Sequence, residues 1–141
     1  MGYHVSMSVT ELIPVEEYLS TDYSPDRDFV DGMLEDRNVG ERDHSRLQGA
    51  LIAWLYARRR ELGIEIYPDQ RVQVSASRDR VPDICVTVGE PDEQIFTTPP
   101  FLCMEILSPE DQMGRVLVKI ADYLDFGVRF VWLIDPRMLF R

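Results

Sequence analysis

A glutamate in the middle of an apolar segment is the feature that most constrains this chain. Residues 101–107 read Phe-Leu-Cys-Met-Glu-Ile-Leu, and the Ser108-Pro109 pair that follows ends a strand, because proline cannot extend a hydrogen-bond ladder. In a buried strand, the carboxylate of Glu105 is costly unless a partner compensates it. The fold must therefore place a cation or a hydrogen-bonding group beside Glu105.

A second strand, over residues 81–88, offers an acidic neighbour for Glu105. Successive strand residues face opposite sides, so Asp83 shares a face with Cys85 and Thr87. If the two strands pair antiparallel, the start of one lies beside the end of the other, and Asp83 comes next to Glu105. Two carboxylates this close repel, so that one is protonated or both share a cation. Neighbouring carboxylate oxygens suit a hard divalent ion such as Mg²⁺ or Mn²⁺.

The third candidate is Lys119, the only lysine in the chain. It lies within a helix expected over residues 112–126, where apolar residues fall on one helical stripe. Lys119 lies beside that stripe, so its stem can pack on apolar surface while its ammonium reaches a polar cluster. Near two metal-bound carboxylates, the ammonium would stabilise a pentacovalent phosphate or orient a water molecule. A buried ion pair with Glu105 is the structural alternative. The stripe consists of Val116, Ile120, Tyr123 and Leu124.

These segments resemble the Uma family of putative restriction endonucleases, which belongs to the PD-(D/E)XK nuclease-like superfamily. The resemblance covers residues 27–136 and rests on Pro82-Asp83, on the Glu-Ile-Leu-Ser-Pro run that begins at Glu105, and on Lys119. In the superfamily the lysine commonly lies two residues after the acid. That position is Leu107 here, so Lys119 corresponds to the relocated lysine of the family. Further matches are Tyr123, Gly127-Val128 and the run Val-Trp-Leu-Ile-Asp-Pro at residues 131–136.

The resemblance implies an α/β fold with a restriction-endonuclease-like core. In such a core a mixed central sheet has a long helix on one face and the helix of Lys119 on another. It also implies a metal-dependent endonuclease, a hydrolase of phosphodiester bonds in DNA. Asp83, Glu105 and the backbone carbonyl of Ile106 would hold Mg²⁺ or Mn²⁺, and Lys119 would steady the attacking water or the developing negative charge.

Three further residues are weaker candidates for this site. Asp28 matches a position that is usually acidic in the family, although ordinary turn and edge chemistry is the favoured interpretation. His44, in the first turn of a helix expected over residues 41–63, matches a histidine that the family often carries. It either reaches a metal site or a phosphate, or is a capped, half-buried side chain. Glu41 is close enough in sequence to be a candidate ligand for a second metal ion.

Departures from the family pattern bear on activity. Met33 and Arg115 stand where the family usually has acids, and the chain stops at Arg141, before the further strands of the family. One alternative is a catalytically inactive nuclease-fold module that binds nucleic acid or protein. Another is a truncated product that pairs into a homodimer through an exposed sheet edge at its C-terminal end. The expected domain is 27–141, truncated at its C-terminus, after an extension over residues 1–26 with a short helix.

Composition narrows the classes of function. The length of 141 residues suits one domain, and the net charge of −10 argues against a broad basic surface for nucleic acid. A metal-dependent nuclease remains compatible with this charge, because bound cations offset acids at the site. No apolar run is long enough to span a membrane and no signal segment is recognisable. The two cysteines are expected to be buried and reduced, which predicts a cytoplasmic protein.

The other segments have local patterns. Asp31-Gly32 between apolar residues predicts a hairpin. The helix over residues 41–63 should end at Gly63, and the arginines at 58–60 are interpreted as its solvated end. Its buried stripe is expected to comprise Leu47, Ala50, Leu51, Trp54, Leu55 and Leu62. The remaining expectations are strands over residues 64–67 and 71–75, a turn over residues 77–80 and a polar loop over residues 89–100.

Overall fold

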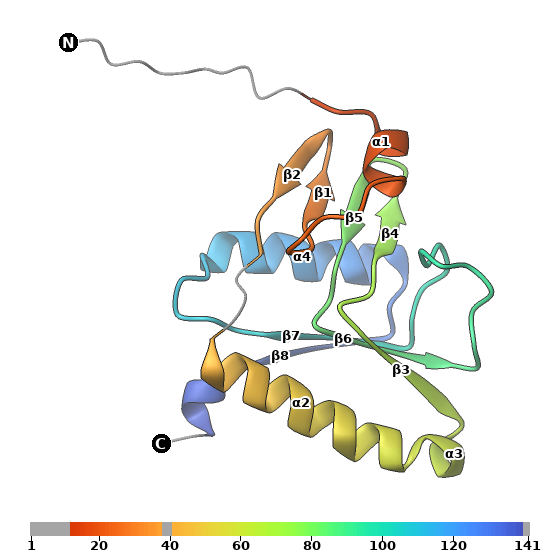
Figure 1. Cartoon of the computed structure of the whole chain (residues 1–141), viewed down its shortest axis with the longest axis vertical. Helices are drawn as coiled ribbons and strands as arrows, with labels where there is room; N and C mark the ends of the chain where they lie inside the picture. The colour runs from red at the N-terminus through yellow and green to blue at the C-terminus, as the bar shows by residue number, and fades with distance from the viewer. Residues whose placement is uncertain (1–11, 38–40, 140–141) are drawn as a thin grey trace.

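Two four-stranded sheets form the framework of the described chain, residues 12–37 and 41–139 of a computed structural model (Figure 1). One sheet has the strand order β3-β6-β7-β8 and carries the two predicted acidic strands. In it β3, β6 and β7 pair antiparallel, whereas β7 and β8 run parallel. The prediction of an α/β fold with a mixed sheet is therefore confirmed. The strands are β3 (Ile64–Pro68), β6 (Ile84–Val88), β7 (Leu102–Ile106) and β8 (Phe130–Ile134).

The second sheet is antiparallel and has the order β2-β1-β5-β4. Its strands are β1 (Asp28–Val30), β2 (Met33–Glu35), β4 (Val72–Ser75) and β5 (Arg78–Arg80). The turn predicted over residues 77–80 is wrong, because β5 is an inner strand that pairs with both β1 and β4. The Arg-Asp-Arg sequence of β5 has no apolar alternation, so its strand conformation depends on its neighbours.

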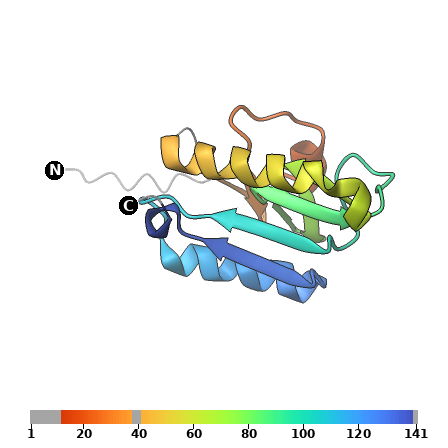
Figure 2. The same cartoon turned by 90° about the horizontal axis from the view of Figure 1, so that it is seen from below.

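Two helices cover opposite faces of the first sheet, as Figure 2 shows. They are α2 (Arg42–Ala57) and α4 (Met113–Phe126). The alternation of side chains on β6 and β7 divides the core into two clusters, one on each face. The cluster on the α2 side contains Leu55, Ile66, Ile84, Val86, Leu102 and Met104. The cluster on the α4 side contains Val72, Val74, Cys85, Phe96, Cys103, Tyr123 and Val128.

The long helix is shorter than predicted and buries fewer residues. It ends at Ala57, and α3 (Arg59–Leu62) follows after a break at Arg58 and stops at Gly63. Trp54 and Leu62, both expected in the buried stripe, are 54 % and 53 % exposed. The guanidinium of Arg58 lies 4.0 Å from the centre of the Trp54 ring and donates a hydrogen bond to the Trp54 carbonyl. This arginine therefore caps the end of α2, in agreement with the solvated-end interpretation.

The shorter elements fix the second sheet in place. In α1 (Val15–Leu19) the ring of Tyr18 is fully buried and stacks on Phe29 of β1. Asp31 and Gly32 both have positive φ, 50° and 90°, which a two-residue type I′ hairpin turn requires. The predicted hairpin is therefore confirmed, as is a short helix near the N-terminus. Residues 1–11, part of the predicted extension, lie outside the described chain.

The last element is η1 (Pro136–Met138), a short 3₁₀ helix that follows β8. Asp135 begins it by accepting a hydrogen bond from the Arg137 backbone N–H, at 2.9 Å. None of the helices in residues 12–37 and 41–139 is long and apolar enough to cross a membrane.

Asp79, in the middle of β5, is a buried carboxylate without a hydrogen-bond partner. It is 0 % exposed, and in the described chain both of its side-chain oxygens lack a donor. Burial raises the pKa of Asp79 to about 7, and the nearby charge of Arg71 only partly opposes this rise. The folded chain therefore keeps this side chain mostly protonated below neutral pH.

We expect Asp79→Asn to stabilise the chain more at pH 8 than at pH 5. The folded-state pKa lies above the ordinary value of 3.8, so the folded chain holds a proton that the unfolded chain has released. Wild-type stability from this group is therefore full below about pH 4 and is lost as the pH rises to about 7. Asparagine has no such proton. Because one pKa unit corresponds to about 1.4 kcal/mol, the gain in urea unfolding should be roughly 2–3 kcal/mol larger at pH 8.

Asp92→Asn is the control, because Asp92 is exposed in the loop between β6 and β7. It should change the free energy of unfolding little and equally at both pH values. A gain for Asp79→Asn that does not depend on pH would show that the carboxylate is ionised in the folded chain.

Candidate active site

A cleft of about 200 Å³ opens at the C-terminal end of β7. Its walls come from both sheets, from the beginning of α2 and from α4. Three segments far apart in the sequence meet in it, because β7 ends here, β6 begins beside it, and α4 returns across the same sheet. The predicted site residues that line the cleft are Asp28, His44, Asp83, Glu105, Ile106 and Lys119.

Asp83 and Glu105 lie beside each other, as the antiparallel pairing predicts. Ile84 is opposite Met104, so the residue before β6 comes next to the last residues of β7. The Asp83 Oδ2 atom accepts a hydrogen bond of 2.7 Å from the Ile106 backbone N–H. Both carboxylates are buried, with 4 % and 7 % exposure. The side chain of Asp83 is thus attached directly to the strand that carries Glu105.

The two cysteines lie opposite each other on the same pair of strands, β6 and β7. Cys85 of β6 is opposite Cys103 of β7, and both are free thiols with 0 % exposure. The contact with Cys85, together with burial, raises the pKa of Cys103 well above its ordinary value. A buried thiol with a raised pKa is a poor nucleophile, so both cysteines are interpreted as part of the packed core.

Two basic side chains contact the other oxygen of Asp83. Its Oδ1 atom accepts a hydrogen bond of 2.9 Å from Arg37, and it lies 3.3 Å from His44 Nε2. Burial alone would raise the pKa of Asp83, but the hydrogen bond from His44 and the charge of Arg37 lower it below its ordinary value. The same hydrogen bond raises the pKa of His44. Asp83 is therefore ionised, and His44 contacts the predicted site instead of only capping its helix.

Glu105 is held by two side chains of α4. Its Oε1 atom accepts a hydrogen bond of 2.6 Å from the Tyr123 hydroxyl, and its Oε2 atom lies 3.8 Å from Lys119 Nζ. Burial raises the pKa of Glu105 to about 7, against the lowering effect of Lys119. The sequence placed Tyr123 in the apolar stripe and matched it to the family, but gave it no role beside Glu105. Its position four residues after Lys119, on the same side of a helix, was the available signal.

Lys119 is shared between Glu105 and Asp28. Its Nζ atom lies 3.5 Å from Asp28 Oδ2, slightly closer than Glu105 Oε2. Burial lowers the pKa of Lys119, but the charges of Glu105 and Asp28 outweigh it and raise the pKa above its ordinary value. The ammonium is therefore charged at neutral pH, with its side chain 21 % exposed toward the cleft.

Asp28 belongs to the cleft through a buried ion network that the sequence did not reveal. Its Oδ1 atom accepts from the Val81 backbone N–H at 3.1 Å, and Arg80 Nη1 lies 3.2 Å from its Oδ2 atom. The same Arg80 binds Asp122 of α4 at 2.7 Å and Glu35 of β2 at 3.1 Å. Asp28 is therefore a buried residue of an inner strand, and its interpretation as ordinary turn and edge chemistry was wrong. Arg80 connects the second sheet to α4 and fixes the acid that contacts Lys119.

Some of the residues singled out from the sequence lie elsewhere. Glu41 does not line the cleft and borders a neighbouring hollow, where a hydrogen bond with Glu110 raises the pKa of Glu41. Met33 is 44 % exposed and also lies outside the cleft, whereas Arg115 lines it. The second-metal role for Glu41 thus has no geometric support in the described chain.

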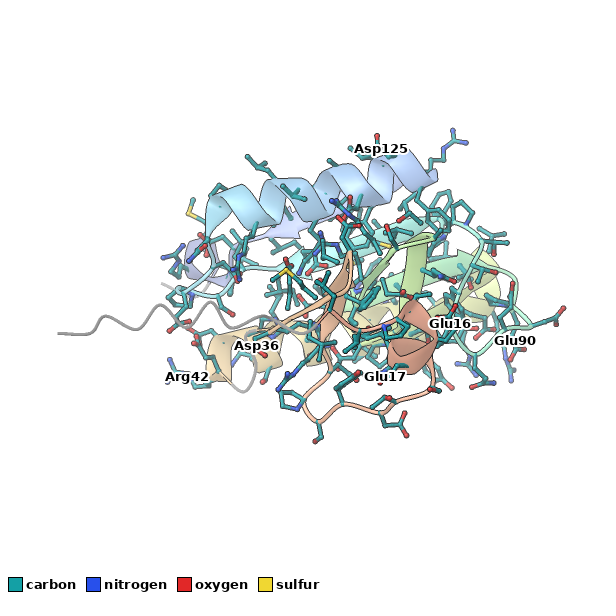
Figure 3. The ribbon with its side chains drawn as sticks, turned by 90° about the horizontal axis from the view of Figure 1, so that it is seen from above. Glu16, Glu17, Asp36, Arg42, Glu90 and Asp125 are labelled. Atoms are coloured by element: carbon teal, nitrogen blue, oxygen red, sulfur yellow. The ribbon has the colours of Figure 1, made fainter. Side chains whose placement is uncertain are left out.

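The electrostatics of the cleft favour a bound cation. Carboxylates outnumber cationic side chains in its lining. The labelled Glu16, Glu17, Glu90 and Asp125 are exposed on the outer surface, so they add negative charge there and do not offset the negative charge of the cleft (Figure 3). The acids of the lining are Asp28, Glu35, Asp36, Asp83, Glu105, Glu110 and Asp111, against Arg37, Arg115 and Lys119.

The donor chemistry fits a hard divalent ion. Asp83 and Glu105 line one cleft, and Ile106, whose backbone carbonyl is the third predicted ligand, lines the same cleft. In the described residues no three His, Cys, Asp or Glu side chains form a ready-made metal-binding group. Water or substrate oxygens would therefore have to complete the coordination, which is the usual arrangement for Mg²⁺.

Comparisons with known proteins agree with this architecture. The profile of the Uma2 family, described as a putative restriction endonuclease, matches residues 15–138. The crystal structure of a putative nuclease belonging to DUF820 from Anabaena variabilis is similar, with a TM-score of 0.77 and 23 % sequence identity. The similarity covers 89 % of this chain and 75 % of that chain, and at this identity it supports the fold alone. No match was found among curated proteins. The chain belongs to the Uma2 family of putative restriction endonucleases.

Proposed function

We propose that this chain is an endonuclease that hydrolyses phosphodiester bonds of DNA with Mg²⁺ or Mn²⁺. The observation that carries the proposal is the meeting of Asp83, Glu105 and Lys119 in one cleft. Two acids and a charged lysine at one point are what metal-assisted phosphoryl transfer requires of its protein. Membership of the Uma2 family supports nuclease chemistry in general.

Asp83, Glu105 and the Ile106 carbonyl would hold the divalent ion. When bound, such an ion lowers the pKa of a coordinated water and polarises a phosphoryl oxygen. The protein prepares both carboxylates for this role. The backbone N–H of Ile106 orients Asp83, and the Tyr123 hydroxyl orients Glu105. Preorganised ligands of this kind need little rearrangement when the substrate arrives.

Lys119 would act on the charge that develops on the phosphate. Its ammonium is held by Asp28 and Glu105 at 3.5 and 3.8 Å, so it points into the cleft without being neutralised by a single tight contact. Asp28 itself is fixed by Arg80 and by the Val81 N–H. Asp28 and Arg80 would therefore be positioning residues, which keep Lys119 where a phosphate oxygen or the attacking water lies.

The proposal predicts that Glu105→Gln weakens Mn²⁺ binding at least tenfold in titration calorimetry. Glutamine keeps the size of the side chain and can still bond Tyr123, but it lacks the negative charge that attracts the ion. Glu90→Gln is the matched control, since Glu90 is exposed and distant from the cleft, and it should bind Mn²⁺ like wild type. Equal heats for wild type and Glu105→Gln would contradict the metal assignment.

A catalytically inactive module is the second candidate, and one contact favours it. Arg37 lies 2.9 Å from Asp83 Oδ1, so a guanidinium already compensates the acid that a metal ion would need. In such a module the cleft would bind a partner but carry out no chemistry. Wild type that shows no Mn²⁺ heat and no nicking of supercoiled plasmid, yet retards DNA in gel shifts, would favour this function.

A further inference from the structure

Arg37 is a cation inside the candidate site that the proposed reaction does not use. It follows β2, its side chain is 7 % exposed, and it lines the cleft. One atom, Nη2, lies 2.9 Å from Asp83 Oδ1 and also 3.3 Å from Asp69 Oδ1. The guanidinium, which is always charged, is therefore shared between a proposed metal ligand and a second carboxylate beside it.

Asp69 is held in a defined position relative to Asp83. It lies in the turn between β3 and β4, and its backbone N–H donates to the Asp83 carbonyl at 3.3 Å. The side-chain amide of Gln48 donates to the same carbonyl at 2.9 Å and to Asp69 Oδ1 at 3.2 Å. Asp69 does not belong to the lining of the cleft, and its side chain is 45 % exposed. It thus offers Arg37 an acceptor outside the proposed metal site.

A divalent ion on Asp83 would have to compete with Arg37. A carboxylate has about four lone-pair positions on its two oxygens. The Ile106 N–H donates to Oδ2 of Asp83, whereas Arg37 and His44 both contact Oδ1. A guanidinium 2.9 Å from Oδ1 also repels an ion on the same carboxylate, and burial of Asp83 weakens the screening by water.

Arg37 differs from Lys119 in where its second partner lies. Lys119 lies 3.5 and 3.8 Å from two acids of the cleft that are both buried. Moving it away from either acid would leave a buried carboxylate without this cation, which is costly. Arg37, in contrast, can leave Asp83 to the ion and keep a carboxylate partner in Asp69. Because Nη2 already contacts both acids, a rotation of the arginine side chain suffices for this exchange.

We propose that Arg37 competes with the divalent ion for Asp83, and that Asp69 determines how strongly it competes. When an ion binds, Arg37 moves from Asp83 Oδ1 to Asp69, and it returns when the ion leaves. Asp69 is therefore a positioning residue that acts on the ion only through Arg37. This inference rests on the proposed function, because it takes Asp83 to be a metal ligand.

Titration calorimetry with Mn²⁺ measures the competition directly. Arg37→Met should bind Mn²⁺ about tenfold more tightly than wild type, because the competing charge has been removed. Asp69→Asn should bind Mn²⁺ about fivefold more weakly, because Arg37 then has no second carboxylate and stays on Asp83. Asparagine tolerates the positive φ of 49° at this position, so Asp69→Asn should retain the fold. Circular dichroism of each variant checks its folding.

The double variant separates this competition from the simple loss of an acid. In the Arg37→Met background, Asp69→Asn should change the Mn²⁺ affinity by less than about twofold, since the residue through which Asp69 acts is gone. Asp43→Asn is the matched control. Asp43 is also partly exposed, contacts an arginine and lies outside the lining of the cleft. Its replacement should change the affinity by less than about twofold with or without Arg37.

Equal Mn²⁺ affinities for wild type and Arg37→Met overturn the exchange but leave the metal assignment standing. An effect of Asp69→Asn that persists in the Arg37→Met background, or that is no larger than the effect of Asp43→Asn, overturns it as well. The comparison of Asp69→Asn with Asp43→Asn does not depend on whether Arg37→Met folds. Binding of Mn²⁺ by Arg37→Met alone supports the exchange. If neither wild type nor Arg37→Met binds Mn²⁺, the metal assignment is wrong and the exchange falls with it.

Discussion

Lys119→Met should lower the rate of plasmid nicking by about 10²–10³-fold while leaving the chain folded. Methionine retains a long, flexible apolar side chain that can pack where the lysine stem packs. What it removes is the ammonium that lies 3.5 Å from Asp28 and 3.8 Å from Glu105. No other lysine exists in the chain to replace it. The measurement is the rate at which supercoiled plasmid is converted to the open-circular form with Mn²⁺, with the protein in molar excess over the DNA.

Arg115→Met is the matched control for this loss. Arg115 is on the same helix, one turn before Lys119, and it lines the cleft but is exposed to solvent. Loss of an exposed cation should weaken DNA binding and cost at most about tenfold in nicking. If Lys119→Met nicks as fast as wild type, the catalytic assignment of Lys119 is wrong. The Lys119 variant should also bind Mn²⁺ at least as tightly, because a positive charge has left the site.

Arg80→Met should destabilise the fold by about 3–5 kcal/mol in urea unfolding at pH 7. Arg80 is 2 % exposed and lies within hydrogen-bond distance of Asp28, Glu35 and Asp122, which come from three different elements. Its removal leaves the buried Asp28 carboxylate with the longer contact to Lys119, at 3.5 Å, and a buried charge that is only partly compensated is costlier than the loss of the ion pairs themselves. Because Asp28 is also the partner of Lys119, the variant should lose nicking activity as well.

Arg78→Met, two residues earlier in the same strand, separates this burial effect from a general charge effect. Arg78 binds Asp31 and Asp122, but its side chain is 30 % exposed and Asp31 is more than half exposed. Partly solvated pairs contribute little, so a loss of about 1 kcal/mol or less is expected. Similar losses for Arg78→Met and Arg80→Met would mean that the burial of Arg80 is not what makes it important.

The first sheet and its acids could be predicted because their signals are local. An apolar run with one glutamate, a Pro-Asp before a second apolar run, and a helical stripe beside a lone lysine each occupy fewer than about 15 residues. Alternation of side chains then predicted that Asp83 and Glu105 lie on the same side of an antiparallel strand pair. The structure has this register, with Cys85 opposite Cys103. The family resemblance added the order of the segments.

The inner strand of the second sheet, β5, escaped prediction because it is polar. β5 has only charged residues, and they are stabilised by partners distant in the chain, such as Glu35, which is 45 residues before Arg80. The stripe of the long helix was also overestimated. Trp54 and Leu62 have the right period, but Trp54 packs against the guanidinium of Arg58, and Leu62 lies in α3, beyond the break in the helix; both are more than half exposed.

What the sequence determined by itself is the set of strands and helices that carry the candidate site and the face on which each acid lies. Periodicity settles these features, because a strand or helix repeats its side-chain directions over a few residues. Only the tertiary structure decided which groups compensate those acids: Arg37 and His44 for Asp83, the neutral Tyr123 hydroxyl for Glu105, and the network of Arg80 for Asp28. Such pairings depend on contacts across long separations in the chain, and the cost of a buried charge becomes apparent only when its surroundings are known.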